Sequence, residues 1–257
     1  LYYVVEFDIK GFFDNVDHSK LIRQLWSLNI RDKKLLHVIR RILKAPIQMP
    51  DGHLENPKKG TPQGGLISPV LANVYLHYVL DSWFTKHVLP TLNGEAYLVR
   101  FADDFILLFQ YENEAQDVYK RLVDRLAVFN LEVEQDKTHI LPFGRFKGTN
   151  ETFDFLGFTH PNSTTKTGKY TVGHKVSKKK KKLFRQKIKE WSKKNRGITT
   201  DLFMKKLNTK LTGTYRFYGI SGTMKELQYL NQIAFTVTFK WINRRSQRRS
   251  YAMQEYY

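Results

Sequence analysis

The chain has 257 residues, 41% of them hydrophobic and 14% aromatic, which is typical of a folded protein and excludes a disordered one. It holds no apolar stretch long enough to span a bilayer, so we expect neither a transmembrane helix nor a membrane partner. The absence of cysteine excludes disulfides and Cys-type zinc sites, and it fits a cytoplasmic location. The opening residues LYYVVEFDIK form a strand-like run without a basic leader, so we expect the sequence to begin inside a longer protein.

The net charge of +19 is concentrated at one end of the chain. Residues 1–173 carry 21 Lys and Arg against 20 Asp and Glu, whereas residues 174–257 carry 22 against 4. A solvated surface accounts for such an excess equally well. In a folded, aromatic-rich segment, however, a one-sided positive field favours a polyanionic partner, with nucleic acid first among the candidates.

Hydrophobic periodicity predicts a mixture of strands and helices over residues 1–173. The expected elements are a strand over 1–8, helices over 19–28 and 32–43, a hairpin over 47–55, a helix over 69–84 with Ser68 as N-cap, a hairpin over 96–110, a helix over 113–127, and short strands within 133–140, 153–158 and 169–174.

The remainder is predicted to be helical, with helices at residues 178–194, 200–218 and 224–245. We therefore expect an α+β fold in two domains. The first domain is expected over residues 1–173 and the second, basic and helical, over residues 174–257.

Three carboxylates lie at the ends of apolar strands. Asp8 ends the first strand, and Asp103 and Asp104 lie between the arms of the second hairpin. Aspartate also favours turns, so Asp103 alone is equally well explained as a turn former. The adjacent pair is harder to explain in that way, because two neighbouring acids repel each other and the turn lacks glycine. Hard oxygen ligands of this kind suit Mg²⁺, and two such ions support phosphoryl transfer.

Five segments in order then resemble a known family. They are DIKGFFDNVDH (8–18), GTPQGGLISPVLANVYL (60–76), RFADDFILLF (100–109), LEVEQDKTHI (131–140) and FDFLGF (153–158). Together they resemble the motifs of group II intron-encoded reverse transcriptases, the maturases. The resemblance implies a right-hand polymerase palm, an antiparallel sheet backed by helices, followed by a helical thumb in which LNTKLTGTYRFYGI and FKWINRRSQRRSY look similar.

The resemblance implies catalytic and metal-binding roles. Asp8 and Asp103 would ligate two Mg²⁺ ions, Asp104 would complete the acidic cluster, and the backbone carbonyl of Ile9 would add a ligand. It also implies that an upstream fingers region is missing here, so that this chain alone need not be active.

The nucleotide-binding residues that it implies are Phe13, Gln63, Gly64 and Lys137. Phe13 falls where the family places an aromatic gate that rejects a 2′-hydroxyl, whereas Phe12 is expected in the core. Gln63 would contact the nucleotide or the template, and Gly64 would allow a close backbone approach, although PQGG also suits an ordinary turn. Lys137 would approach the triphosphate as a cationic acid, unless it is merely solvated.

Phe155, Leu156 and Gly157 resemble the primer grip, with Gly157 allowing the primer backbone to come close. Arg100 lies just before the acidic turn, and two roles are open for it: pairing with a carboxylate or contact with the primer. It is not included in the predicted site.

The basic segment is predicted to bind RNA phosphates. In the first of its helices, Leu183, Ile188 and Trp191 are expected to pack inward while the cations face outward. The predicted RNA contacts are Lys178, Lys179, Lys180, Lys181, Lys182, Arg185, Arg244, Arg245, Arg248 and Arg249. Part of the last cluster is expected to serve the helix dipole instead.

The function expected from the resemblance is an RNA-directed DNA polymerase. Its partners would be an RNA template or intron RNA, a DNA primer and deoxynucleoside triphosphates, and nothing in the sequence indicates an oligomeric state. The alternative is an RNA-binding splicing cofactor in which polymerisation is secondary or lost. An RNA-dependent RNA polymerase is disfavoured by Phe13.

Overall fold

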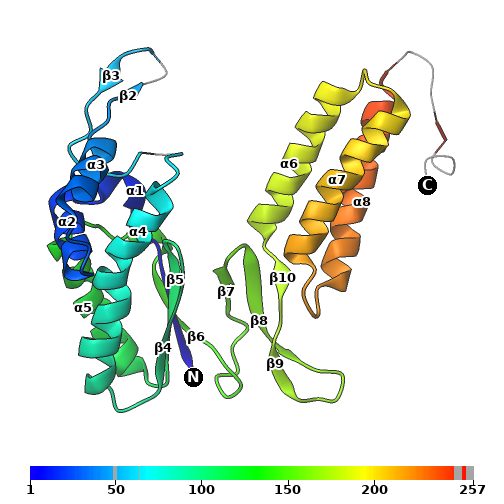
Figure 1. The fold of residues 1–257 in the computed structure, drawn as a ribbon. Helices are drawn as coiled ribbons and strands as arrows, with labels where there is room; N and C mark the ends of the chain where they lie inside the picture. The colour runs from blue at the N-terminus through cyan, green and yellow to red at the C-terminus, as the bar shows by residue number, and fades with distance from the viewer. Residues whose placement is uncertain (49–50, 63, 246–250, 253–257) are drawn as a thin grey trace. The chain divides into compact units, whose positions relative to one another are not determined.

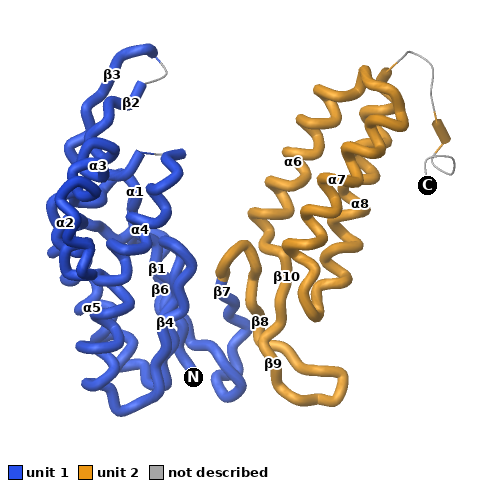
Figure 2. The backbone as a smooth tube through the Cα atoms, in the orientation of Figure 1, with its two compact units in different colours: residues 1–153 blue, residues 154–257 orange. Residues whose placement is uncertain are grey.

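The computed structural model describes residues 1–48, 51–62, 64–245 and 251–252. The chain forms two compact units, residues 1–153 and 154–257 (Figure 2). The division therefore comes before Gly173, where the charge and the periodicity of the sequence change. The reason is that the strands between these two points pair with one another and lead directly into the helices of the second unit.

The first unit is built around an antiparallel sheet with the strand order β4-β5-β1-β6. Its strands are β1 (Tyr3–Phe7), β4 (Ala96–Phe101), β5 (Asp104–Phe109) and β6 (His139–Pro142). The central strand β1 pairs with both β5 and β6, so its backbone hydrogen bonds are satisfied on both edges. Its residues are apolar apart from Glu6, which suits a strand at the centre of a sheet.

Helices pack against this sheet (Figure 1). The helical segments of the first unit are α1 (Phe12–Asn15), α2 (His18–Ser27), α3 (Lys33–Leu43), α4 (Ser68–Leu76), η1 (His77–Asp81), η2 (Phe84–Val88), η3 (Leu89–Thr91), α5 (Glu112–Val128) and η4 (Gln135–Lys137). A short hairpin, β2 (Ile47–Gln48) and β3 (Leu54–Glu55), confirms the hairpin expected over residues 47–55. Phe7, Phe105, Phe109 and Tyr75 are buried in the core between sheet and helices.

The helical segment after residue 67 differs from the expected one at both ends. Ser68 is not the N-cap: Ile67 takes that place, and the Ser68 hydroxyl donates to the carbonyl of Pro62 at 2.8 Å. The helix also runs on as π-helix through η1 and η2, to Val88. π-helical turns are rare and often mark functional sites. Here the first of them carries Asp81.

The second unit contains short strands followed by three helices. The strands are β7 (Thr152–Phe155), whose first two residues belong to the first unit, β8 (Phe158–Thr164), β9 (Tyr170–Val172) and β10 (Lys175–Val176). The helices are α6 (Lys178–Asn195), α7 (Thr200–Tyr218) and α8 (Met224–Ile242). The apolar core of the helices includes Ile188, Phe203 and Leu207. Among the described residues, no helix is both long enough and apolar enough to cross a membrane.

The inward face of α6 was predicted incorrectly at one position. Leu183 is 40% exposed, and Phe184 packs against the core instead. Phe184, Ile188 and Trp191 follow the i, i+4, i+7 spacing of one helical face, which Leu183 does not. The helix nevertheless begins as expected, since the Ser177 hydroxyl accepts a hydrogen bond from the Lys180 amide.

Candidate active site

Asp8 and Asp104 lie at the same end of the central strand pair. Strand β1 ends at Phe7, which is the register partner of Phe105 in β5. Continued one residue beyond the paired positions, the same register would set Asp8 level with Asp104. Opposite residues in an antiparallel pair have Cα atoms roughly 4.5–5.5 Å apart. The sheet therefore brings together two acids that are far apart in the sequence.

Asp103 occupies the tight turn of the β4–β5 hairpin. Phe101 is the register partner of Asp104, so Ala102 and Asp103 alone form the connection. Ala102 has φ 55, in the left-handed region that glycine favours. Holding a residue other than glycine there costs roughly 1–3 kcal/mol, so neighbouring contacts must maintain this conformation.

The strand end that carries Asp8 is fixed from its other edge. The Glu134 amide donates to the Asp8 carbonyl at 2.9 Å, and the Lys10 amide donates to the Glu132 carbonyl at 2.9 Å. Ile9 pairs with Val133 between these two bonds, and its side chain is buried. This pairing does not use the carbonyl of Ile9, which is the group predicted to bind metal.

Lys137 lies against the carboxylate of Asp8. Its Nζ is 2.6 Å from Oδ2 of Asp8, and both side chains are substantially exposed. This hydrogen bond and the charge of Asp8 raise the pKa of Lys137. The ammonium group thus supplies a positive charge to a carboxylate that is predicted to hold a cation.

The three carboxylates fit Mg²⁺ by their chemistry and by their place in the sheet. They are hard oxygen donors, and they lie at one end of β1 and β5. Their side chains are not gathered into a cage: among the described residues, no group of three or more His, Cys, Asp or Glu side chains could hold a metal ion. The Asp8 carboxylate pairs instead with Lys137.

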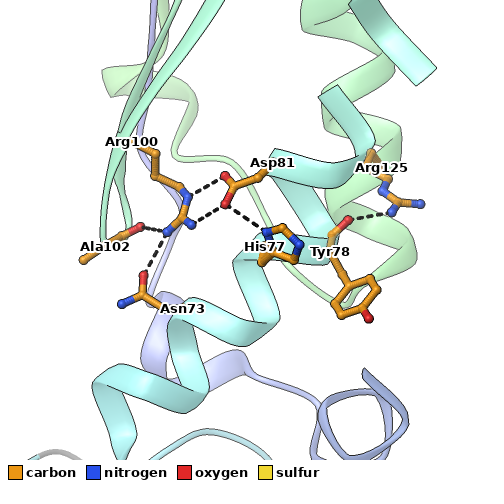
Figure 3. Close-up of polar contacts among 7 residues, drawn as sticks. All are labelled: Asn73, His77, Tyr78, Asp81, Arg100, Ala102 and Arg125. Carbon is orange, nitrogen blue, oxygen red and sulfur yellow. Dashed lines mark hydrogen bonds and ion pairs between the residues drawn. The ribbon is translucent and has the colours of Figure 1, made fainter. Parts of the chain in front are cut away.

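Arg100 pairs with a carboxylate, which was one of the two alternatives open for it. Its Nε and Nη2 donate to the two carboxylate oxygens of Asp81 at 2.7 and 2.5 Å (Figure 3). Its Nη1 donates to Oδ1 of Asn73 at 2.9 Å and to the carbonyl of Ala102 at 2.8 Å. The side chain of Arg100 is only 14% exposed, so these bonds are largely shielded from water.

Phe13 and the loop before α4 are joined through the backbone. The Thr61 amide donates to the Phe13 carbonyl at 2.7 Å, and the Gly60 amide donates to the Val16 carbonyl at 2.8 Å. A Cβ on Gly60 would lie 2.9 Å from the backbone oxygen of Asp14, so glycine is required for this approach. Phe13 is half-buried at the edge of the core, with its ring 5.2 Å from that of the buried Phe12.

The two predicted nucleotide contacts in this loop have different outcomes. Gln63 lies outside the described residues. Gly64 is exposed, has φ 82, and has open space where a Cβ would be. A Cβ on the adjacent Gly65 would lie 2.7 Å from Oγ of Ser68 and 3.2 Å from the Pro62 carbonyl oxygen, so a side chain there would disturb the hydrogen bond between these two groups.

Leu156 and Gly157 form a two-residue turn between β7 and β8, after Phe155 at the end of β7. Both turn residues have positive φ, 52 and 83, which matches the primed turns of tight hairpins. A Cβ on Gly157 would lie 3.2 Å from Cε of Lys180 and 3.5 Å from the hydroxyl of Tyr218. Gly157 therefore allows a close approach by this unit's own helices, and its role in a primer grip stays a prediction.

The predicted RNA contacts fall into different environments. Lys178, Lys179, Lys180, Lys182, Arg185 and Arg244 are exposed. Lys181 pairs with Glu226 of α8 at 2.5 Å, and Arg245 donates to the Thr200 hydroxyl and lies over the Phe203 ring. Arg248 and Arg249 lie outside the described residues. Lys181 and Arg245 thus make contacts within the helical bundle.

Asp81 and Asn73 did not appear among the predicted site residues. The signal that could have found Asp81 is its isolation: it is the one acid in the apolar run YLHYVLDSWF, and Arg100 is the one base in the apolar strand AYLVRF. Two opposite charges isolated in separate apolar segments are best satisfied by each other.

The fold and the position of the acids at the hairpin define a polymerase palm. Residues 2–160 match the family described as "Reverse transcriptase (RNA-dependent DNA polymerase)". The match covers more than half of the chain, and the chain belongs to this family.

Individual relatives agree with this assignment. The chain is 51% identical over 78 residues to the group II intron-encoded protein LtrA of Lactococcus lactis subsp. cremoris, covering 28% of this chain and 12% of that protein. It is 24% identical over 214 residues to protein YkfC of Escherichia coli K12, covering 71% of this chain and 53% of that protein. The chain therefore spans about half the length of YkfC and a smaller part of LtrA. These relatives confirm the resemblance to group II intron-encoded reverse transcriptases.

Solved structures show the same fold. Apo telomerase from Candida tropicalis matches with a TM-score of 0.56 and 14% identity, over 95% of this chain and 42% of that one. Telomerase from Candida albicans matches with a TM-score of 0.53. The expected α+β palm-and-thumb fold is confirmed.

Proposed function

We propose that this chain is the catalytic core of an RNA-directed DNA polymerase of the group II intron type. The single observation that carries the proposal is the register of Phe7 with Phe105. Continued by one residue, this register would set Asp8 level with Asp104, beside the turn that contains Asp103. Membership of the reverse transcriptase family supports the same conclusion.

Each carboxylate has a role in this proposal. Asp8 and Asp103 would hold two Mg²⁺ ions, with Asp104 and the Ile9 carbonyl at the edge of the cluster. When bound, this pair of ions supplies activation of a primer 3′-hydroxyl and charge neutralisation at the leaving pyrophosphate. The chain's own contribution is to hold the acids on rigid strands, with Lys137 as a further cation near Asp8.

The substrates follow from the same site. Phe13 would reject a 2′-hydroxyl and so select deoxynucleoside triphosphates, and Gly64 and Gln63 would line the nucleotide site on the loop that is hydrogen-bonded to the Phe13 backbone. Phe155, Leu156 and Gly157 would hold the DNA primer. The exposed cations of α6 would hold the RNA template. The proposed location of the protein is the cytoplasm.

Primer extension tests the proposal. The assay uses a DNA primer on an RNA template with deoxynucleotides and Mg²⁺, in the longest gene product that carries this sequence. Asp103→Asn keeps the volume of the turn residue but removes its charge. We expect extension to fall by at least about 10³-fold, because metal ligands contribute several kcal/mol to transition-state stabilisation. Asp117→Asn, an exposed acid on α5, is the matched control. Equal extension by wild type and Asp103→Asn would overturn the proposal.

A role in intron RNA folding is a second candidate. It is favoured by the cations of α6, most of which project to solvent from the helical unit. Splicing that persists in Asp103→Asn but falls when Lys179 and Lys182 are changed to Gln would support this role beside polymerisation.

A further inference from the structure

We infer that Arg100 is a positioning residue that fixes the direction of the Asp103 carboxylate, and that Asp81 and Asn73 hold Arg100 for this purpose. The inference rests on the proposed function, because it concerns the acid that would bind metal. It assigns a role to a group of polar residues that lies outside the acidic site itself. Arg100, Asp81, Asn73 and Ala102 are called the Arg100 network below.

The turn between β4 and β5 has a strained backbone at Ala102. Ala102 has φ 55, and it is the first of only two residues that connect β4 and β5. An alanine gains nothing intrinsically from this region of backbone space, since only glycine adopts it without a steric cost. The two-residue connection between paired strands imposes this conformation, and a contact from outside the turn can stabilise it against its steric cost.

Arg100 contacts the backbone of this turn directly. Nη1 of Arg100 donates to the carbonyl of Ala102 at 2.8 Å (Figure 3). That carbonyl belongs to the peptide plane that joins Ala102 to Asp103, and a peptide plane moves as one body. Holding the oxygen limits ψ of Ala102, and φ of Asp103 is limited in turn because β5 is paired from Asp104 onward. It therefore constrains the direction in which the side chain of Asp103 leaves the turn.

The guanidinium group of Arg100 is itself held by Asp81 and Asn73. Asp81 accepts two parallel bonds from Nε and Nη2, and Asn73 accepts a bond from the same Nη1 that reaches Ala102. This bidentate pairing leaves Arg100 little freedom to rotate. Lysine carries the charge but lacks the planar fork, so it cannot reach Asp81 and Ala102 in the same geometry.

The two residues that hold Arg100 lie on a single helical segment. Asp81 and Asn73 come from one helical segment, with Asn73 in α4 and Asp81 at the end of the π-helical η1. The segment is anchored by buried side chains, among them Tyr75 and Leu80. The turn that carries Asp103 is thus fastened to a rigid helix that follows the proposed nucleotide loop, and not only to its own two strands.

The test compares Arg100→Lys with Arg121→Lys in the same chain. Arg121 also ties a backbone carbonyl in the first unit, that of His87 at 2.8 Å, and pairs with an acid, Asp117. It takes no part in the Arg100 network. Asn73→Ala, at an exposed position, is a second variant in case Arg100→Lys does not fold.

Two measurements are made on each variant: amide hydrogen exchange at residues 102–104, and binding of Mn²⁺ alone followed by electron paramagnetic resonance. For Arg100→Lys we expect faster exchange in the turn and Mn²⁺ binding weakened by about tenfold, as found when residues that orient metal ligands are lost. Arg121→Lys is expected to leave both unchanged, whatever its effect on thermal unfolding.

The outcomes separate this inference from the proposed function. Unchanged exchange in both Arg100→Lys and Asn73→Ala would overturn the inference. Unchanged Mn²⁺ binding in Arg100→Lys would also overturn it, provided that Asp103→Ala abolishes that binding. If Asp103→Ala binds Mn²⁺ as the wild type does, the proposed metal site fails, and the exchange data alone decide whether Arg100 fixes the turn.

Discussion

The Nζ atom of Lys137 lies 2.6 Å from Oδ2 of Asp8, so a cation of the protein occupies one face of a carboxylate proposed to hold magnesium. The two residues come from η4 and the end of β1, and the pairing of Ile9 with Val133 brings these segments together. Binding of a metal ion at Asp8 must then compete with the ammonium group of Lys137.

Removal of Lys137 is expected to have two opposite effects. In Lys137→Met, Mn²⁺ alone should bind about two- to fivefold more tightly, because an exposed ion pair of this kind contributes little and no longer competes. The KM for deoxynucleotides should rise, because a positive charge near the triphosphate is lost. Lys166→Met, in an exposed turn, is the control for both titrations. A Lys137→Met protein that matches it in both would show that Lys137 takes no part in metal or nucleotide binding.

Phe13 is expected to govern the choice of sugar. Phe13→Val should reduce discrimination against ribonucleotides by at least about tenfold, because it removes the bulk that would meet a 2′-hydroxyl. The measurement is kcat/KM for paired ribo- and deoxynucleotides. Phe12→Leu is the control: Phe12 is 2% exposed, so this change should lower stability by about 1 kcal/mol and leave discrimination intact. Unaltered discrimination in Phe13→Val would refute the gate.

The lysines of α6 are expected to divide into two groups. Lys179 and Lys182 are exposed, so changing either to Gln should reduce the slope of log K against log salt for RNA binding by roughly 0.7–0.9. Lys181 pairs with Glu226, whose side chain is 16% exposed, so Lys181→Gln should instead lower the thermal midpoint. A fluorescence titration at several salt concentrations and a melting curve distinguish the two groups. Equal salt slopes for wild type and Lys179→Gln would contradict the predicted contact.

The second unit is expected to lose stability in acid through His160. Burial lowers the pKa of His160, and the neighbouring His174, with the two Nδ1 atoms 3.2 Å apart, lowers it further. The unfolded chain, with an ordinary histidine pKa near about 6.5, binds the proton first as the pH falls. The stabilisation is therefore present above about pH 6.5 and is lost below it.

Denaturant unfolding between pH 7.5 and 5 measures this effect. His160→Gln should flatten the pH dependence, whereas His37→Gln, on the exposed face of α3, should leave it as in the wild type. An identical slope in His160→Gln and wild type would assign the acid sensitivity to other groups.

Local patterns predicted the secondary structure better than they predicted side-chain pairing. The helix expected over residues 200–218 is α7 with the same bounds, because an apolar face of Phe203, Leu207 and Leu211 repeats along it. The start of α4 was predicted one residue late, because the Ser68 hydroxyl bonds to a carbonyl of the preceding loop and does not cap the helix. That choice depends on how the loop folds, which periodicity does not encode.

The candidate site divides in the same way. The positions of Asp8, Asp103 and Asp104 at strand ends could be predicted, because apolar runs mark the strands on each side. The pairing of Lys137 with Asp8 could not be predicted, because it depends on a register between strands far apart in the sequence. The bond from Arg100 to Ala102 depends further on a strained turn and a π-helical segment, and neither has a local signal.

The most direct test of the central claim is the location of Mn²⁺ by anomalous scattering in crystals with RNA template, DNA primer and a non-hydrolysable deoxynucleotide. The account predicts two peaks roughly 3.5–4 Å apart, shared by the carboxylates of Asp8 and Asp103. Manganese that is bound elsewhere, or that touches only one of these two acids, would contradict it.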